Sequence, residues 1–201
     1  MNTILDQQAK YIEDHFKGAV TIPPIQNDNL IIYVNKDDIV NFLTFLKSDK
    51  YLSFKVLLDV FGADFLGVKN HRFEVIYNLL SLKLNHRITV KVMVGDEILV
   101  PTVSQVFSSA GWFEREVFDM YGIVFDGHQD LRRILTDYGF EGHPLRKDFP
   151  LTGYKEVRYD DVQKKVIYEP VKLMQEFRNF DFESPWEGQS NKTLPGDEKV
   201  N

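Results

Sequence analysis

The chain has 201 residues, of which 43% are hydrophobic and 27% are charged, a composition that suits one folded domain with an appendage. It contains no cysteine, which excludes disulfides, thiolate metal sites and cysteine-ligated iron–sulfur clusters. With 24 lysines and arginines against 30 acidic residues the formal net charge is −6, which argues against nucleic acid as a main partner.

The sequence lacks an apolar run of the roughly 20 residues that span a bilayer. Its first eight residues lack the basic and apolar regions of a signal peptide, and they are not rich in arginine and serine like a transit peptide. We therefore expect the protein to work in the compartment in which it is made.

The first third of the chain predicts two helices and a hairpin. An amphipathic helix runs from Thr3, which caps it, to near Gly18. Strands at 19–25 and 30–34, joined by the polar turn 27–29, predict a hairpin. Asn35 then caps a second helix, which ends around residues 48–50 and carries an apolar face of Ile39, Phe42, Leu43 and Leu46.

Three strands and two helices follow. The strands are predicted at 54–61, 73–82 and 87–94, with turns short enough for antiparallel neighbours. A third helix opens at Pro101, with Thr102 and Gln105 as a capping box, and is broken by Gly111. A further helix then begins at Trp112 and ends at Gly122, a residue that readily takes the left-handed conformation. Its apolar stripe is Phe113, Val117, Met120 and Tyr121.

This order of elements predicts an α+β fold, a two-layer sandwich with helices on a mixed, mostly antiparallel sheet, over residues 1–125. Glycines and prolines then punctuate an irregular loop at 126–153 that is too apolar for a solvated linker. An extended arm at 154–187 carries scattered large aromatics, and residues 188–201 have the composition of a disordered tail. We expect the arm to lie across another surface, with its aromatics as anchors.

Acidic and basic side chains on the helix at 112–122 form the first candidate site. Glu114 and Glu116 point about 200° apart on a helix, so they cannot converge on one substrate atom. Asp119 can share a site with Arg115 or with Glu116. The alternative, which we favour, is an ion-pair network that pins this helix to the loop that follows.

The loop contains the side chains of a possible metal site. His128 and His143 lie there with Asp130, Glu141 and Asp148, but their spacing matches no recognised zinc pattern. A hydrogen-bonding role is the favoured interpretation for both histidines. A soluble metal-dependent enzyme therefore stays an alternative only.

Basic residues of the loop do not form an anion-binding patch. Four positive charges between residues 126 and 148 meet five negative ones, so the segment is slightly acidic. Guanidinium groups paired with carboxylates of the loop or of a neighbouring protein fit better. No glycine-rich phosphate loop and no serine–histidine arrangement is present. The four positive charges belong to Arg132, Arg133, Arg146 and Lys147.

Several stretches resemble the signature of one family. They are Glu114-Arg115-Glu116, Phe118 to Ile123, Gly127-His128, Asp130 to Leu135, and Gly142 to Leu151, together with the arm from Glu169 to Glu187. The chain is similar here to the 30 kDa subunit, also called the C subunit, of proton-translocating NADH:quinone oxidoreductase, respiratory complex I. Gln129, where the family generally has proline, is a departure that affects only the local backbone.

The resemblance implies a structural subunit of the hydrophilic arm that holds no FMN, iron–sulfur cluster, quinone or metal and has no catalytic residue. It implies packing on the D subunit of complex I, with the B subunit nearby, at the cytoplasmic side of a bacterial inner membrane. A sister quinone oxidoreductase or a membrane-bound hydrogenase is the alternative. The residues that it marks as interface and loop-fixing groups are Glu114, Arg115, Glu116, Asp119, His128, Arg132, Arg133, His143, Arg146, Lys147, Asp148, Phe177 and Trp186.

Overall fold

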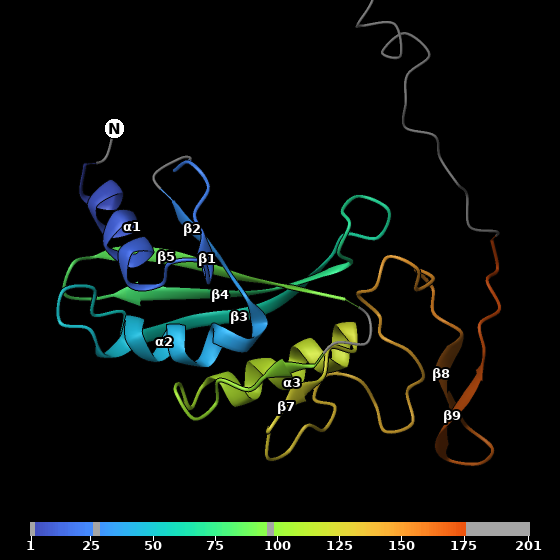
Figure 1. Cartoon of the computed structure of the whole chain (residues 1–201). Helices are drawn as coiled ribbons and strands as arrows, with labels where there is room; N and C mark the ends of the chain where they lie inside the picture. The colour runs from blue at the N-terminus through green and yellow to red at the C-terminus, as the bar shows by residue number, and fades with distance from the viewer. Residues whose placement is uncertain (1–2, 26–28, 96–98, 176–201) are drawn as a thin grey trace, which may run out of the picture. The chain divides into compact units, whose positions relative to one another are not determined.

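The computed structural model of the chain describes residues 3–25, 29–95 and 99–175. The chain divides into two compact units between Gly153 and Tyr154. The first unit is an α+β sandwich, in which helices pack on a mixed sheet (Figure 1). Among the described residues, no helix has both the length and the apolar character needed to cross a bilayer.

A five-stranded sheet forms the centre of the first unit, with strand order β1-β2-β5-β4-β3. Neighbouring strands are antiparallel except β2 and β5, which are parallel, so the prediction of a mixed, mostly antiparallel sheet is confirmed. Alternate residues of β5, such as Val90, are fully buried. The strands are β1 (Val20–Thr21), β2 (Leu30–Val34), β3 (Val56–Asp64), β4 (Phe73–Ser81) and β5 (His86–Val94).

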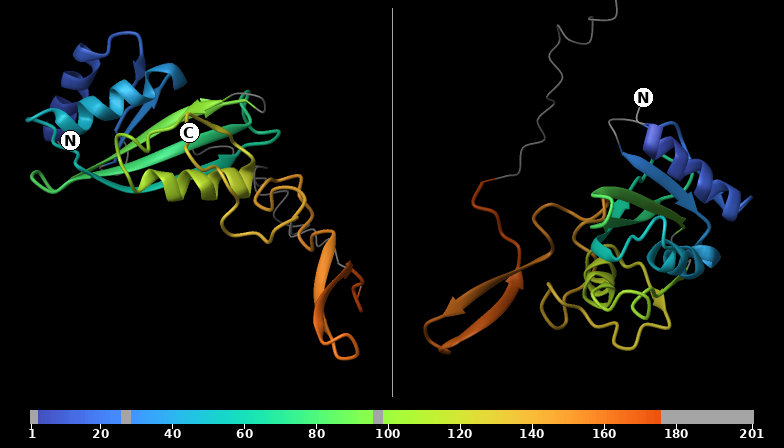
Figure 2. Two further views of the ribbon diagram at one scale, coloured as in Figure 1. Left: turned by 90° about the horizontal axis from the view of Figure 1, so that it is seen from below. Right: turned by 90° about the vertical axis from the view of Figure 1, so that its left-hand side faces the viewer.

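Helices α2 (Ile39–Ser48) and α3 (Ala110–Tyr121) lie against one face of this sheet (Figure 1). Helix α1 (Thr3–His15) lies beside α2 (Figure 2), and the ring of Phe16 stands 5.1 Å from that of Phe42. Their apolar faces join the inner face of the sheet in one core. Gly122 ends α3 with φ of 75°, as the sequence predicts.

The predicted helix after Pro101 is wrong. Strand β6 (Val100–Pro101) pairs there with β7 (Phe125–Asp126), and turns carry the chain to Ala110, where α3 begins. Gly111 therefore lies inside α3 instead of breaking a helix. The predicted capping box is also wrong, because the hydroxyl of Thr102 donates to Glu114 of α3 at 2.5 Å. The same hydroxyl accepts the Ser104 N–H at 3.2 Å, so Thr102 closes a local turn and holds α3 at once.

Smaller differences concern the first third of the chain. The strand predicted at 19–25 is only two residues long, because Pro23 and Pro24 interrupt the pairing. Asn35 precedes a short 3-10 turn, η1 (Lys36–Asp38), and its side chain makes no capping hydrogen bond. The side chain of Thr3, the predicted cap, and residues 27 and 28 of the predicted turn lie outside what the structure describes.

The second unit contains a hairpin that the sequence analysis did not predict. Strands β8 (Lys155–Asp160) and β9 (Lys165–Pro170) pair antiparallel. Their turn is fixed by Asp160, whose Oδ1 accepts the N–H groups of Val162 at 2.8 Å and Gln163 at 2.9 Å. Residues 176–201, which include Phe177, Trp186 and the predicted tail, lie outside the described part of the chain.

Candidate functional site

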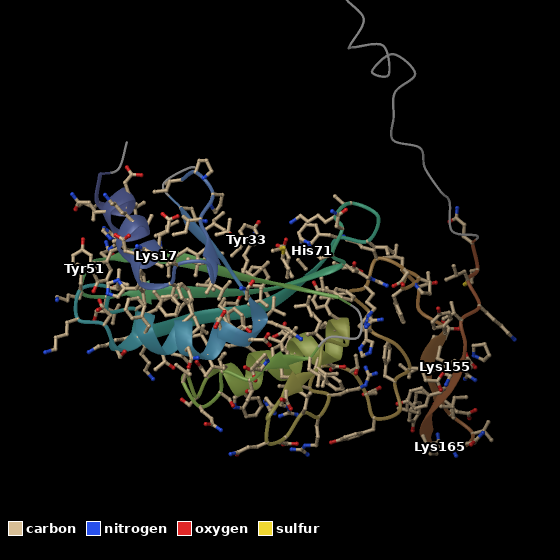
Figure 3. All side chains as sticks on the ribbon, viewed as in Figure 1. Lys17, Tyr33, Tyr51, His71, Lys155 and Lys165 are labelled. Atoms are coloured by element: carbon tan, nitrogen blue, oxygen red, sulfur yellow. The ribbon has the colours of Figure 1, made fainter. Side chains whose placement is uncertain are left out.

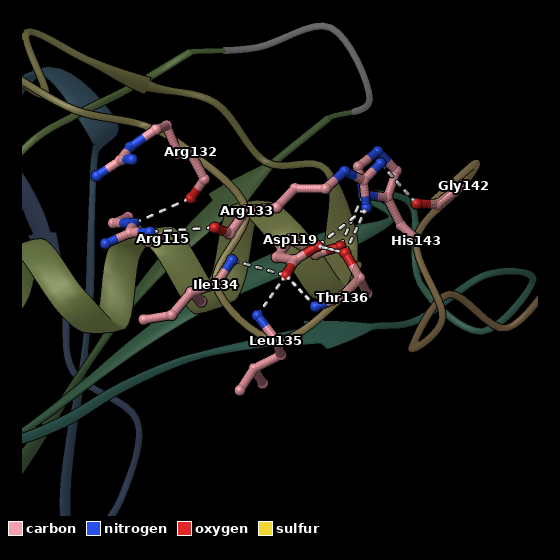
Figure 4. Close-up of polar contacts among 9 residues, drawn as sticks. All are labelled: Arg115, Asp119, Arg132, Arg133, Ile134, Leu135, Thr136, Gly142 and His143. Carbon is pink, nitrogen blue, oxygen red and sulfur yellow. Dashed lines mark hydrogen bonds and ion pairs between the residues drawn. The ribbon is translucent and has the colours of Figure 1, made fainter. Parts of the chain in front are cut away.

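Asp119 of α3 binds the backbone of the loop at 126–153 (Figure 4). Its Oδ2 accepts three consecutive backbone N–H groups, from Ile134 at 3.0 Å, Leu135 at 2.8 Å and Thr136 at 2.9 Å. Its Oδ1 accepts the Thr136 hydroxyl at 2.6 Å and Nη1 of Arg133 at 2.9 Å. The carboxylate is fully buried, and both of its oxygens are engaged.

These contacts set the ionisation of Asp119. Burial by itself raises the pKa of a carboxyl group, but here the hydrogen bonds from Thr136, Leu135 and Ile134 outweigh it. The pKa of Asp119 therefore lies well below its ordinary range, and the group is a carboxylate at neutral pH. A carboxylate that accepts three backbone N–H groups is a structural anchor. It carries no proton at neutral pH that it could donate to a substrate.

Two arginines complete the attachment of the loop. Arg115, one turn before Asp119 on α3, donates from Nε to the carbonyl of Arg132 and from Nη2 to that of Arg133, each at 3.0 Å (Figure 4). Arg133 reaches back to Asp119 and also donates to the carbonyl of Gly142 at 3.0 Å. The carboxylate and the two guanidinium groups thus join α3 to two parts of one loop.

The C-terminal end of α3 is capped by the same loop. Nδ1 of His143 bonds to the carbonyl of Asp119 at 2.9 Å, the N–H of Leu145 to Met120 at 3.1 Å, and Nε of Arg146 to Tyr121 at 2.6 Å. These three carbonyls have no partner within the helix, so the loop supplies what a helix end lacks. A Cβ at Gly122 would lie 2.6 Å from both Arg146 and His143.

His143 is held in its neutral form. Burial lowers its pKa, the bond to the Asp119 carbonyl opposes this, and the charges of Arg146 and Arg133 lower it further. The net direction is downward from 6.5. Because Nδ1 faces a carbonyl oxygen, it carries the proton and donates it.

Glu114 and His128 form a second cluster at the other end of α3. Glu114 is fully buried and accepts the Thr102 hydroxyl at 2.5 Å and the Val103 N–H at 2.7 Å. Burial raises the pKa of Glu114. The two hydrogen bonds and nearby His128 lower it, but the net direction is upward. His128 donates from Nε2 to the carbonyl of Gly111 at 3.0 Å and accepts the Asp130 N–H at Nδ1. Both of its nitrogens are therefore used in local structure.

The sequence analysis missed Asp64 and Arg72, which anchor the far end of the loop. Asp64, at the end of β3, is buried and accepts two bonds from Arg72, both at 3.2 Å, and the Lys147 N–H at 2.8 Å. Arg72 also binds Asp148 at 2.7 Å. Burial raises the pKa of Asp64, but these bonds lower it overall. The contacts of Asp64 with Lys147 and of Arg72 with Asp148 join residues more than 70 positions apart, which no local sequence pattern can predict.

The remaining predicted site residues lie at the surface. Glu116 is exposed, and Arg132 forms an exposed pair with Asp130, at 2.7 Å and 2.8 Å. Lys147 takes part through its backbone N–H. In the part of the chain that the structure describes, no three histidine, aspartate or glutamate side chains come together as a metal site would need. His128 and His143 bind different partners, the carbonyls of Gly111 and Asp119.

The anchored loop presents apolar side chains to solvent. Leu135 is 62% exposed, Tyr138 97%, Leu145 51% and Leu151 82%. The backbone N–H of Leu135 donates to Asp119, and that of Leu145 donates to the Met120 carbonyl of α3. Exposed apolar groups on a fixed backbone are typical of a surface that another protein covers.

The hairpin of the second unit also has one apolar face. In the register of β8 and β9, Val157 is opposite Tyr168 and Tyr159 opposite Val166, and each of these side chains is more than half exposed. The other face carries Ile167 among charged side chains, including the ion pair between Arg158 and Glu169, whose Nε and Oε1 are 3.2 Å apart. An isolated two-stranded hairpin cannot bury such a face by itself.

Residues 32–155, more than half of the chain, match the family described as respiratory-chain NADH dehydrogenase, 30 Kd subunit. The chain belongs to this family. Among similar proteins, the C subunit of NADH-quinone oxidoreductase from Chelativorans sp. (strain BNC1) is 55% identical over 200 residues, covering 100% of this chain and 99% of that protein. The C subunit from Paramagnetospirillum magneticum is 62% identical over 172 residues, covering 86% and 85%.

Two solved structures resemble this 30 kDa subunit. A trypsin-resistant fragment of Nqo5 has a TM-score of 0.55 and 30% identity, and covers 63% of this chain and 98% of its own. A chain of the membrane-bound sulfane sulfur reductase, an archaeal respiratory membrane complex, has a TM-score of 0.65 and covers 89% and 98%. Its identity of 24% supports a shared fold alone. The α+β fold and the family expected from the sequence are both confirmed.

Proposed function

We propose that this chain is the non-catalytic, structural 30 kDa subunit in the hydrophilic arm of NADH:quinone oxidoreductase. It takes part in electron transfer from NADH to quinone only as a member of that complex. In this proposal other subunits hold FMN, the iron–sulfur clusters and quinone. The complex is attached to a bacterial inner membrane, with this chain on the cytoplasmic side.

One observation carries the proposal: the loop at 126–153 is anchored by buried charges yet turns apolar side chains outward. A catalytic loop would use its charged groups on a substrate, whereas Asp119 and Arg115 are consumed by backbone bonds. Tyr138 and Leu151 remain exposed on that fixed frame. Such a frame favours a preformed interface, because little ordering entropy is lost when a partner binds.

The hairpin supports the second half of the proposal, that the arm at 154–187 lies along a neighbouring subunit. Its apolar face of Val157, Tyr159, Val166 and Tyr168 is suited to packing against a second protein surface. We propose the D subunit of complex I as the main partner of the loop and the arm, with the B subunit nearby. Phe177 and Trp186 are further candidate anchors of the arm.

Purification of a tagged full-length chain from its own cells in mild detergent tests the proposal. Mass spectrometry should find the other complex I subunits, and the eluate should show NADH:quinone activity that rotenone or piericidin inhibits. Recovery of the chain alone, without such activity, would overturn the subunit assignment.

Variants then test the role of the arm. Deletion of residues 154–201 should leave the first unit folded by circular dichroism but abolish recovery of the D subunit. Tyr159→Ser with Val166→Ser should lower that recovery, whereas Val162→Ser should not, because Val162 lies in the turn and is 92% exposed. Normal assembly of the deletion variant would contradict the proposed role of the arm.

A further inference from the structure

A polar cavity of about 620 Å³ lies beside the start of β5, outside the region of the loop and α3. Its lining includes Asn29, Asn78, Asn85 and Arg87, with Leu58 as an apolar wall. The Thr89 hydroxyl lies 2.9 Å from Oδ1 of Asn78 and 3.5 Å from Oδ1 of Asn29, so it can donate to either oxygen. The hydrogen-bond donors of this lining are the guanidinium of Arg87 and the side-chain amides of the asparagines, which also carry acceptor oxygens.

Arg87 supplies the positive charge of this cavity. Among the arginines in the described part of the chain, it alone has a side chain that makes no hydrogen bond, ion pair or ring contact. Asp59, opposite Asn78 on the neighbouring strand, forms no ion pair with it. A guanidinium without a side-chain partner, beside asparagine amides, is complementary to a carboxylate.

Beyond the cavity, apolar side chains on this face of the sheet lie among charged ones, such as Lys91 and the buried Glu74. Arg87, Asn78 and Thr89 alternate with the core residues of β4 and β5, so they face away from α2 and α3. Phe61 and Met93 lie on this same face, 38% and 47% exposed, outside the core cluster. In Figure 3 Tyr33, also of this face, lies on the other side of the sheet from α2.

We propose that this outer face of the sheet is a second docking site, for a protein segment with an aspartate or glutamate side chain. The carboxylate binds Arg87 and the asparagine amides in the cavity, and apolar neighbours in the segment cover Leu58 and Phe61. This site lies on the opposite side of the sheet from α3 and its loop, so it takes a different protein surface from the one bound by the loop.

Site-specific photo-cross-linking in the full-length chain tests the site. Benzoylphenylalanine replaces Leu58 in one variant and Tyr159 of the hairpin in another, and the irradiated complex is purified and analysed by mass spectrometry. The Leu58 position should join a peptide of another protein that contains an aspartate or glutamate. Arg87→Glu should lower that product at least about fivefold and leave the Tyr159 product unchanged. Reversal of the partner's acidic residue to lysine should restore it.

Lys10→Glu, on the exposed surface of α1, is the matched charge reversal and should change neither product. The proposal is overturned if Leu58 forms no product while Tyr159 does, if Leu58 joins a second copy of this chain, or if Arg87→Glu leaves the yield unchanged. Loss of both products, with no co-purifying complex I subunits, would instead overturn the function proposed above together with this site.

Discussion

Arg115 and Asp119 are one turn apart on α3, and both bind the backbone of residues 132–136. Arg115 binds carbonyl groups there, whereas Asp119 binds N–H groups. Arg115 donates to the carbonyls of residues 132 and 133, and Asp119 accepts the N–H groups of residues 134–136. Five consecutive residues of irregular backbone are thereby satisfied by two side chains of one helix face. This explains how a segment without regular secondary structure keeps one conformation.

Asp119→Asn should lower the free energy of unfolding by about 3 kcal/mol, because it removes a buried anion and leaves Arg133 without its ion-pair partner. The amide N–H groups of Ile134, Leu135 and Thr136 should also lose protection in hydrogen exchange. Urea titration with hydrogen-exchange mass spectrometry measures both. Asp130→Asn, on the exposed pair with Arg132, should leave both nearly unchanged. Equal effects of the two variants would contradict the anchoring role.

His143 makes stability depend on pH. Its pKa is lowered in the folded state, so the unfolded chain binds the proton more readily. The neutral His143 side chain therefore contributes its full share to the free energy of unfolding above the ordinary pKa of 6.5. This contribution is lost as the pH falls below that value. His143→Asn, whose amide can donate to the same carbonyl, should be less sensitive to pH than the parent chain between pH 7 and 5. Parallel curves for the two proteins in denaturant titrations would refute this.

Gly122→Ala should destabilise the first unit by about 2 kcal/mol or more. The residue has φ of 75°, and a Cβ would displace both His143 and Arg146. Gly67→Ala is the control, because Gly67 has φ of 73° but no neighbouring atom within 4 Å. It should cost about 1 kcal/mol, the conformational part alone. Thermal unfolding by calorimetry separates the two, and the prediction fails if their costs are equal.

Asp64→Asn should cost about 3 kcal/mol and release the loop near Lys147, because the buried carboxylate binds both that N–H and Arg72. Asp148→Asn removes the other, exposed carboxylate on the same arginine and should cost less than about 1 kcal/mol. Chemical denaturation ranks the two variants. A larger loss for Asp148→Asn would show that the exposed pair is the true anchor.

The failed prediction after Pro101 shows where local pattern is insufficient. Val103 and Phe107 have helical spacing, but they are buried within turns, and Thr102 binds Glu114 twelve positions away. The helix at 112–121 is predicted correctly because its stripe continues for three turns and Gly122 marks its end. A single buried contact can outweigh the propensity of one helical turn, whereas it seldom overrides three.

The sequence by itself determined the α+β class, most strand positions, the end of α3 and the family, because these depend on periodicity and on residue types at fixed spacing. It also marked Asp119, Arg133 and His143 as members of one segment. Only the tertiary structure decided what they bind. Asp119 meets amides fifteen or more positions later, Asp64 meets Lys147, and the side chain of Arg87 has no partner among the described residues. Such contacts arise when the folded core brings distant segments together, and no local spacing encodes them.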